Sequence, residues 1–215
     1  WEFSPELAIT ASAILATSAG WMAYSFAALT DLPMAATLNA AVLLLLFHGG
    51  AERAWIAGAL LGFSILGKGF VPVVLFAPVV FCAKKDWWKI AAAAVVVAAP
   101  WYVLCYLQNG SAFWDEFFWK HHVSRFLSPE LEHVQPFWYY IPVLLAGLFP
   151  WTPLVGLIGS RRSLEDERVR FLLMFLIYGM VFFSAATNKL PAYILPLLPA
   201  MAVMLAVAVD KSRNA

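Results

Sequence analysis

Charged residues are scarce in this sequence. Only 13% of its 215 residues are Asp, Glu, Lys or Arg, whereas 63% are hydrophobic, and the mean hydropathy is +0.78. Soluble globular domains carry about 25% charged residues, so this composition excludes an ordinary soluble domain. The net charge is only +1, and the Lys and Arg residues form short clusters rather than a basic stripe, which argues against a nucleic-acid partner.

Cysteine is also scarce, and the two cysteines do not predict a disulfide. Cys82 and Cys105 fall on opposite membrane faces in the topology described below, so their sulfur atoms are too far apart to bond. We expect both to be small apolar packing residues. Segments of about ten residues with alternating hydrophobicity, which are typical of a membrane β-barrel, are absent from the sequence as well.

Long apolar runs, by contrast, occupy most of the chain. There are about eight of them, most near the ~20 residues that a helix needs to cross a bilayer, where a helix satisfies its own backbone polar groups. We therefore predict an all-α polytopic transmembrane bundle that forms a single domain over residues 1–215. Because the chain begins at Trp1 without Met and shows no signal peptide, we expect it to be a fragment of a longer membrane protein. The predicted spans are 7–30, 32–50, 54–67, 69–83, 90–107, 138–159, 171–187 and 191–209.

The positive charges favour one membrane face. If the spans alternate in direction, most Lys and Arg residues fall in connections on one side, which is the cytoplasmic side because these residues are rarely carried across during insertion. They are Arg53, Lys84, Lys85, Lys89, Arg161, Arg162, Arg168, Arg170, Lys211 and Arg213. The outer side holds Lys68, Lys120, Arg125 and Lys189. These few outer charges are not explained as topology signals, and so they are candidates for chemistry.

The spans 54–67 and 69–83 are short, and they meet at Gly67, Lys68 and Gly69. Each covers about 21 Å at 1.5 Å per residue, less than the ~30 Å hydrocarbon core. A charge and irregular backbone within the membrane profile are tolerated where protein or a water-filled cavity surrounds them. We therefore expect Lys68 to face an aqueous cavity on the outer side. The alternative is a lysine that snorkels from an ordinary helix end.

The longest connection, 108–137, lies on the outer side and is rich in aromatic residues. A helix across 112–127 would place Trp114, His121 and Arg125 on one side, because positions four apart share a helix face. Aromatic residues mixed with charges favour an element that lies in the plane of the lipid headgroups. We therefore predict an external loop over 108–137 that contains an interfacial helix.

Several polar residues gather on the outer side, with few carboxylates among them. Lys supplies a point charge and Arg a bidentate fork for phosphate oxygens, so the group suits an anionic headgroup such as a lipid phosphate. For Asp31, capping of the helix that it begins is an equally good explanation as a role in this site.

The histidines indicate a metal site only weakly, because the adjacent His121 and His122 point to different helix faces and no zinc-type spacing occurs. We assign no metal ligand. The residues on this side are Asp31, Lys68, His121, His122, Arg125, Asn188 and Lys189.

Short motifs stand at the ends of the predicted spans. They are LTDLPM (29–34), GFSILGKG (62–69), PWY (100–102), FFWKHHVSRF (117–126), PFWYYIP (136–142), PW (150–151) and FSAATNKLPAYILP (183–196). In this order, over nearly the whole chain, they resemble the central and later helices of bacterial glycosyltransferases that use lipid-linked sugars. This is the GT-C-type superfamily of the protein O-mannosyltransferases, which includes the aminoarabinose transferase acting on lipid A. The resemblance is specific for the superfamily and not for the acceptor.

The resemblance implies inverting transfer of a sugar from a polyprenyl-phosphate donor to an acceptor on a lipid, protein or glycan. It places the reaction at the periplasmic face of the bacterial inner membrane. The residues that would contact the donor phosphate by matching position are Lys68, His121, Arg125 and Lys189. Those that would line the same cavity are Asp31, His122, Asn188 and Tyr193. Such cations would stabilise the negative charge of the departing phosphate. Beyond the lipid-linked donor no cofactor is implied, and metal dependence stays open.

Two other classes of protein fit parts of the pattern. A secondary transporter or lipid flippase also contains broken helices and intramembrane charges, but it places its binding groups near the midplane and shows related halves. Here the unusual charges cluster on one face, and no internal repeat is visible. A purely structural membrane subunit would leave Lys68 and Lys189 unexplained.

The resemblance also yields a prediction about residues 1–215 in isolation. In this superfamily the proposed catalytic carboxylate lies in the first external loop, upstream of the matching segments. A protein consisting of residues 1–215 is therefore expected to show no sugar transfer in an assay with a polyprenyl-phosphate sugar. Measurable transfer would instead place the general base within this chain.

Overall fold

The structure, a computed structural model, describes residues 4–46, 52–117 and 134–213. Within these ranges the backbone is mainly helical, and one antiparallel bridge pairs Val134 with Asn188. The predicted all-α class is confirmed.

The observed helices follow the predicted spans. The first half of the chain forms α1 (Pro5–Ala16), α2 (Ala19–Ser25), α3 (Asp31–Leu46), α4 (Glu52–Lys68), α5 (Val71–Ala83), the 3-10 turn η1 (Lys84–Asp86), α6 (Trp87–Asn109) and α7 (Ser111–Trp114). The second half forms η4 (Phe137–Tyr139), α9 (Tyr140–Gly147), η5 (Thr152–Leu154), α10 (Val155–Ile158), α11 (Arg161–Leu164), α12 (Glu167–Ala185), η6 (Pro191–Leu197) and α13 (Leu198–Arg213). The predicted interfacial helix over 112–127 stays a prediction: α7 covers only Ser111–Trp114, and residues 118–127 lie outside the described residues.

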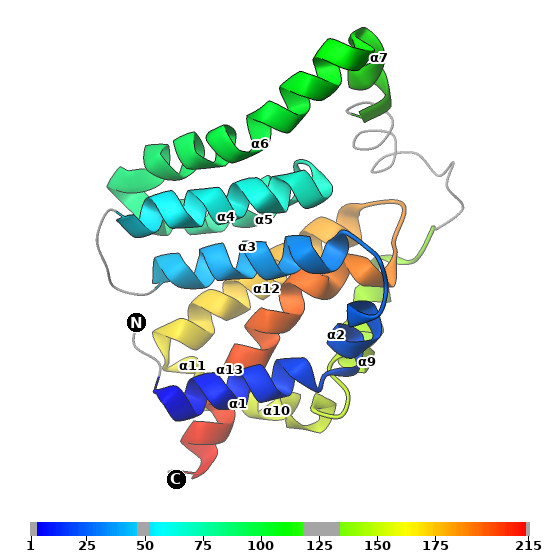
Figure 1. The fold of residues 1–215 in the computed structure, drawn as a ribbon. Coiled ribbons are helices and arrows are strands. Elements are labelled where there is room, and N and C mark those ends of the chain that lie inside the picture. Colours follow the sequence, from blue (N-terminus) through cyan, green and yellow to red (C-terminus); the bar gives the residue numbers. More distant parts are fainter. Residues whose placement is uncertain (1–3, 47–51, 118–133, 214–215) are drawn as a thin grey trace.

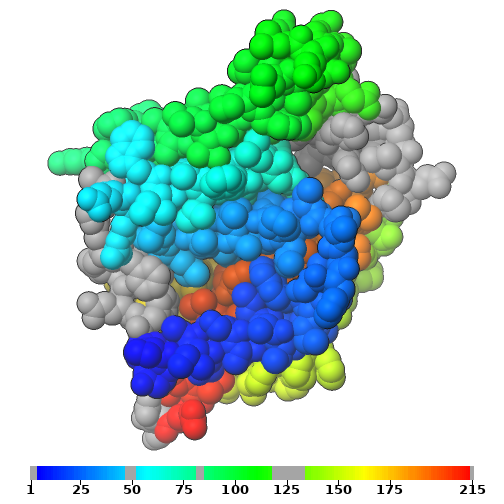
Figure 2. Space-filling model, in the orientation of Figure 1, coloured from blue at the N-terminus to red at the C-terminus, as the bar shows by residue number. Residues whose placement is uncertain are grey.

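The long helices pack side by side, with α13 at the centre of the core (Figure 1). Every residue of α13 from Leu198 to Ala208 is buried. α1 and α12 pack against α13, whereas α3, α4 and α6 follow one another outward. Figure 2 shows α1, α3, α4 and α6 in this order on one face, with α13 visible between α1 and α3. On the edge helix α6, apolar side chains such as Val96 and Leu107 remain 72% and 73% exposed, which suits contact with lipid.

Within the part of the chain that the structure describes, three stretches are long and apolar enough to cross a membrane on their own: α6, α12, and η6 together with α13. Two further spans result if each bent pair is counted as one: α1 with α2, which meet at 65°, and Phe137–Gly147 with Thr152–Ile158, which meet at 112°. The helices α3 and α5 are apolar but shorter. The predicted number of about eight membrane segments therefore stays a prediction.

The basic residues collect at one end of the bundle. The helices alternate in direction, so the starts of α4, α6 and α12 lie at the same end as the last turn of α13 (Figure 1). These elements, with η1 and α11, contain all the Lys and Arg residues that the charge pattern assigned to one side. We call this the basic end and the opposite one the site end. The assignment of the basic end to the cytoplasm remains a prediction.

Close packing of α4 against α6 depends on two glycines. A Cβ atom on Gly58 would lie 2.4 Å from the carbonyl oxygen of Ile90, and one on Gly62 would lie 2.7 Å from the side chain of Val97. Small residues four positions apart allow two helices to approach closely in a membrane, where van der Waals contact is a main source of helix association. The two helices therefore meet across a surface that larger residues at these positions would force apart.

Prolines inside the bundle remove backbone donors, and polar side chains replace them. Pro78 interrupts α5, so the carbonyl of Val74 loses the N–H that a regular helix would supply. The hydroxyl of Tyr178, on α12, donates to this carbonyl oxygen at 3.0 Å. Asn39, on α3, donates in the same way to the carbonyl of Pro196 at 2.8 Å. These hydrogen bonds join distant helices where an unsatisfied carbonyl would be costly.

Replacement of Tyr178 by Phe tests this explanation. We expect Y178F to lower the free energy of unfolding by about 1 kcal/mol, the scale of side-chain hydrogen bonds between membrane helices. In a P78A background the restored N–H of residue 78 can bond to the carbonyl of Val74. Y178F should therefore lower the free energy of unfolding by less in this background than in the wild type. Unfolding of the four variants in detergent gives the interaction energy. Equal costs of Y178F in both backgrounds would contradict the explanation.

A carboxylate ties three helices together at the basic end. Asp166 caps α12 by accepting the N–H of Arg168 at 2.9 Å, and both its oxygens bind the Arg168 guanidinium at 3.0 and 2.8 Å. Lys211, from α13, lies 3.1 Å from the same carboxylate and donates to the carbonyl of Arg162 on α11. The hydrogen bonds from Arg168 hold the pKa of Asp166 well below its usual range, against the opposing effect of burial.

This lowered pKa predicts a specific acid sensitivity. A carboxyl group whose pKa is lower in the folded state stabilises the fold above its unfolded pKa, near 3.8, and loses that contribution as the pH falls further. We expect D166N to lower the Tm at neutral pH and to flatten the decrease in Tm between about pH 4 and pH 2. Thermal unfolding across this range, with wild type as reference, provides the measurement. A D166N profile parallel to that of wild type would contradict the prediction.

Candidate functional site: a cavity at the site end

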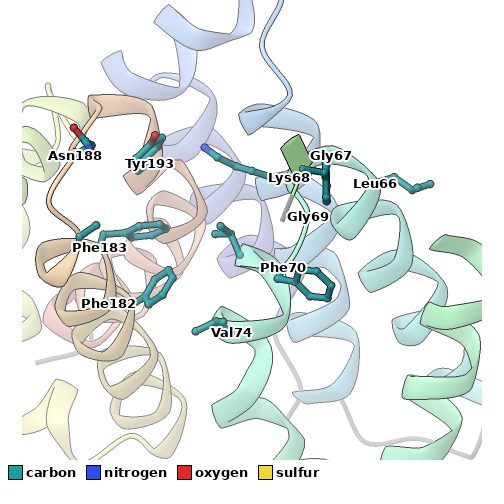
Figure 3. A pocket seen from close by; sticks show the side chains of 13 residues that line it. Leu66, Gly67, Lys68, Gly69, Phe70, Val74, Phe182, Phe183, Asn188 and Tyr193 are labelled. Carbon is teal, nitrogen blue, oxygen red and sulfur yellow. The ribbon is translucent and has the colours of Figure 1, made fainter. Parts of the chain in front are cut away.

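A cavity of about 420 Å³ lies at the site end, between the α4–α5 turn and the segment that joins α12 to η6. Figure 3 shows Lys68 reaching toward Tyr193, with Phe70, Val74, Phe182 and Phe183 on the same side of both. The cavity thus combines one charged group with a largely apolar wall. Its lining residues are Leu66, Gly67, Lys68, Gly69, Phe70, Val71, Val74, Phe117, Phe182, Phe183, Ala186, Asn188 and Tyr193.

The turn after α4 places Lys68 in this cavity. Gly69 has φ +61°, a left-handed conformation that favours glycine, and its N–H bonds to the carbonyl of Ile65 at 2.7 Å. Lys68 is therefore the last residue of α4, where the helix dipole favours a cation. The predicted break at residues 67–69 is confirmed as a tight turn between two short helices.

Lys68 is held by two different partners. Its ammonium forms an ion pair with Asp31, and it lies 4.1 Å from the centre of the Tyr193 ring. The Lys68 and Asp31 side chains are 20% and 12% exposed. Asp31 is the first residue of α3, where the dipole favours an anion, so the antiparallel α3 and α4 bring the pair together. Lys68 therefore points into the protein rather than out to the lipid.

Lys189 lies in the same region but in another environment. It is 5% exposed, and its ammonium donates to the carbonyl oxygens of Gln135 at 3.0 Å and Ala186 at 2.5 Å. Burial lowers the pKa of this lysine. Its neighbour Asn188 is also buried, lines the cavity and pairs with Val134.

The structure brings several of the predicted residues together. Lys68, Asn188 and Tyr193 all line the cavity, and Asp31 joins them through Lys68. The predicted His121, His122 and Arg125 lie outside the described residues, as does His133. Among the residues that are described, no three His, Cys, Asp or Glu come together as a metal site.

Sequence reasoning missed the apolar part of the site. The cavity wall contains Phe70 from the α4–α5 turn, Val74 from α5, and Phe182 and Phe183 from α12, which is far from them in the sequence. These residues look like ordinary membrane helix residues, so nothing in their local pattern distinguishes them. The contact between Lys68 and Tyr193 could have been sought as a cation–π pair, but it depends on the tertiary fold.

Together, the fold and the site define a polytopic helical membrane protein with an apolar cavity that contains a paired lysine. No family model matches the chain. Over 164 residues it is 37% identical to the undecaprenyl phosphate-alpha-4-amino-4-deoxy-L-arabinose arabinosyl transferase of Serratia proteamaculans and 33% identical to the protein of the same name from Photorhabdus laumondii. Both matches cover 70% of this chain, but only 29% and 30% of those relatives.

The fold is similar to two crystal structures of ArnT from Cupriavidus metallidurans. The structure bound to undecaprenyl phosphate matches with a TM-score of 0.83 over 96% of this chain, and the apo structure with 0.80 over 99%. The sequence identities are 23% and 22%, and the matches cover 41% and 42% of those chains. The chain therefore belongs to the polyprenyl-phosphate-sugar-dependent membrane glycosyltransferases, as its motifs predicted. It spans less than a third of the length of the curated relatives it matches.

Proposed function

We propose that this chain forms the donor-phosphate site of a glycosyltransferase that transfers a sugar from undecaprenyl phosphate to an acceptor at the periplasmic face. The names of the relatives support 4-amino-4-deoxy-L-arabinose as the sugar. The resemblance to lipid A aminoarabinose transferases favours lipid A over a protein as the acceptor. The observation that carries the proposal is the paired Lys68 at a largely apolar cavity.

The cavity has the two chemical features that a polyprenyl phosphate requires. The apolar wall formed by Phe70, Val74, Phe182 and Phe183 suits the hydrocarbon chain of the lipid. Lys68 supplies a cation for the phosphate oxygens, and it would stabilise the charge that develops on this phosphate as the sugar departs. The chain thus contributes leaving-group stabilisation, and the proposal assigns no general base to it.

Phosphate binding at Lys68 involves competition with Asp31. In this structure Asp31 already neutralises the ammonium, so a phosphate that binds Lys68 must displace the carboxylate. We propose that Arg125 and His121, which the motifs place in the long external connection, supply further cations for this phosphate. Because both Asp31 and phosphate are anionic, exchange between them keeps Lys68 paired throughout.

The secondary transporter or lipid flippase is not favoured as the alternative. The relatives named above are transferases, and Lys68 and Lys189 both lie at the site end rather than near the middle of the bundle. We likewise propose the bacterial inner membrane as the location, with this end facing the periplasm. The basic residues at the opposite end support this orientation.

Substitution of Lys68 in the full-length protein tests the proposal. We expect K68M to lower sugar transfer about 100-fold, the effect of removing one charge-stabilising donor. K68A and an Ala substitution at Arg125 are expected to act in the same direction. Initial rates with an undecaprenyl-phosphate sugar provide the measurement, and expression level and membrane insertion should match wild type.

Two matched variants make this test specific. K89M removes an ammonium that is paired with Asp86 at the basic end, and it should leave transfer unchanged. D31N removes the competing carboxylate and keeps Lys68, so binding of undecaprenyl phosphate should be retained or become tighter. Normal turnover in K68M would remove the phosphate assignment.

A further inference from the structure

The segment between α12 and η6 connects two parts of the cavity. Its residues Ala186 and Asn188 line the cavity directly. At its end, the carbonyl of Leu190 accepts the N–H of Tyr193 at 3.1 Å and the hydroxyl of Tyr140 at 3.2 Å. Tyr193 in turn lies against Lys68. The position of this segment therefore determines where one partner of Lys68 lies.

Lys189 fixes this segment to a distant part of the chain. Its ammonium donates to Ala186 within the segment and to Gln135, which is 54 residues away and ends the long external connection. The bridge between Val134 and Asn188 joins the same two strands of backbone. One buried side chain thus holds the end of the external connection against the wall of the cavity.

The partners of Lys189 also differ in kind from those of Lys68. An anionic phosphate can take the place of the Asp31 carboxylate, because both are anions and the lysine stays paired. If Lys189 turned toward a phosphate, it would leave the carbonyls of Ala186 and Gln135 without the donor they now have. The loss would be costly above all at Ala186, whose hydrogen bond to Lys189 is buried, whereas the one to Gln135 is partly buried. The contacts therefore favour a fixed position for Lys189.

We propose that Lys189 is a positioning residue of the transferase, which locks segment 186–190 to residues 134–135 and thereby holds Tyr193 in place beside Lys68. This proposal rests on the proposed function and assigns Lys189 a role different from the phosphate contact predicted from the sequence. Because the two carbonyls need N–H donors, the role depends on the donors of the side chain more than on its charge.

Two substitutions of Lys189 in the full-length protein separate the effect of its N–H donors from the effect of its charge. K189M removes the donors and keeps the length of the side chain, whereas K189Q is neutral but retains two N–H donors. We expect K189M to lower kcat about 100-fold, as misplacement of a reacting group does, with a smaller effect on KM. K189Q should recover about tenfold of that loss, because its amide can still bond at least one carbonyl.

Backbone hydrogen–deuterium exchange measures directly whether Lys189 holds segment 186–190 against residues 134–135. Opening of a local hydrogen-bonded unit raises exchange at its amides, so K189M should raise exchange in both 134–135 and 186–190 by about tenfold or more. K189Q should fall between K189M and wild type. The control K89M, at the basic end, should leave both segments at the wild-type rate.

Ligand binding shows whether Lys189 positions the segment 186–190 or contacts the phosphate. A side chain that contacts phosphate determines how much tighter undecaprenyl phosphate binds than undecaprenol, so K68M should lower this ratio about tenfold. K189M should change the ratio less than about threefold, because it removes no phosphate contact. A tenfold loss of the ratio in K189M would overturn the proposal, as would unchanged exchange or unchanged turnover.

The proposed function can fail separately. If wild-type protein transferred no sugar from the undecaprenyl-phosphate donor, the function would be wrong, whereas the exchange data would still show whether Lys189 locks the two segments. If wild type transferred sugar and K189Q behaved like K189M in both rate and exchange, the function would stand and the positioning role would be wrong.

Discussion

A cation withdrawn from water must be paired or hydrogen-bonded, and this requirement organises the site end of the bundle. Lys68 meets it through Asp31 and the Tyr193 ring, and Lys189 meets it through two backbone carbonyls. Each of these sets of contacts joins segments that are far apart in the sequence. The pair of Lys68 and Asp31 connects α4 to α3, whereas Lys189 connects the end of α12 to the start of η4. At the site end the helices are thus held together by Lys68, which gives the cavity its charge, and by the nearby Lys189.

The same requirement acts on the backbone within the bundle. Pro78 removes an N–H donor from α5, and a side chain of α12 supplies the missing donor, while a side chain of α3 donates to a carbonyl of η6. Tyr178 reaches Val74, and Asn39 reaches Pro196. Because the freed carbonyl and its donor lie on different helices, each irregularity in one helix fixes its position relative to a second. Irregular backbone near the cavity is therefore compatible with a rigid wall.

Much of the fold could be predicted from the sequence, because apolar runs and charge segregation are properties of local composition. The turn at Gly67, Lys68 and Gly69 was predicted from the short spans on either side, and the structure confirms it. The close contact of α4 and α6 was not predicted, although Gly58 and Gly62 have the spacing that permits it. The apolar wall was missed for a different reason, since Phe182 and Phe183 differ in no local way from other residues of a membrane helix. The grouping of Lys68 with Tyr193 depends on tertiary structure alone.

Lys68 and Lys189 show that a scarcity of charged residues can locate a functional region without revealing the role of each charged residue in it. Both were singled out because few cations lie on the outer side, and both lie beside the cavity. Their roles differ because their partners differ. A carboxylate can be exchanged for another anion without leaving the lysine unpaired, which is why we propose Lys68 as the phosphate-binding group. Backbone carbonyls belong to the fold and cannot be exchanged for a ligand without loss of two hydrogen bonds, of which the one to Ala186 is buried and the one to Gln135 partly buried, so Lys189 is suited to hold structure. The identity of the acceptor atoms, which only the fold reveals, separates a binding group from a positioning group.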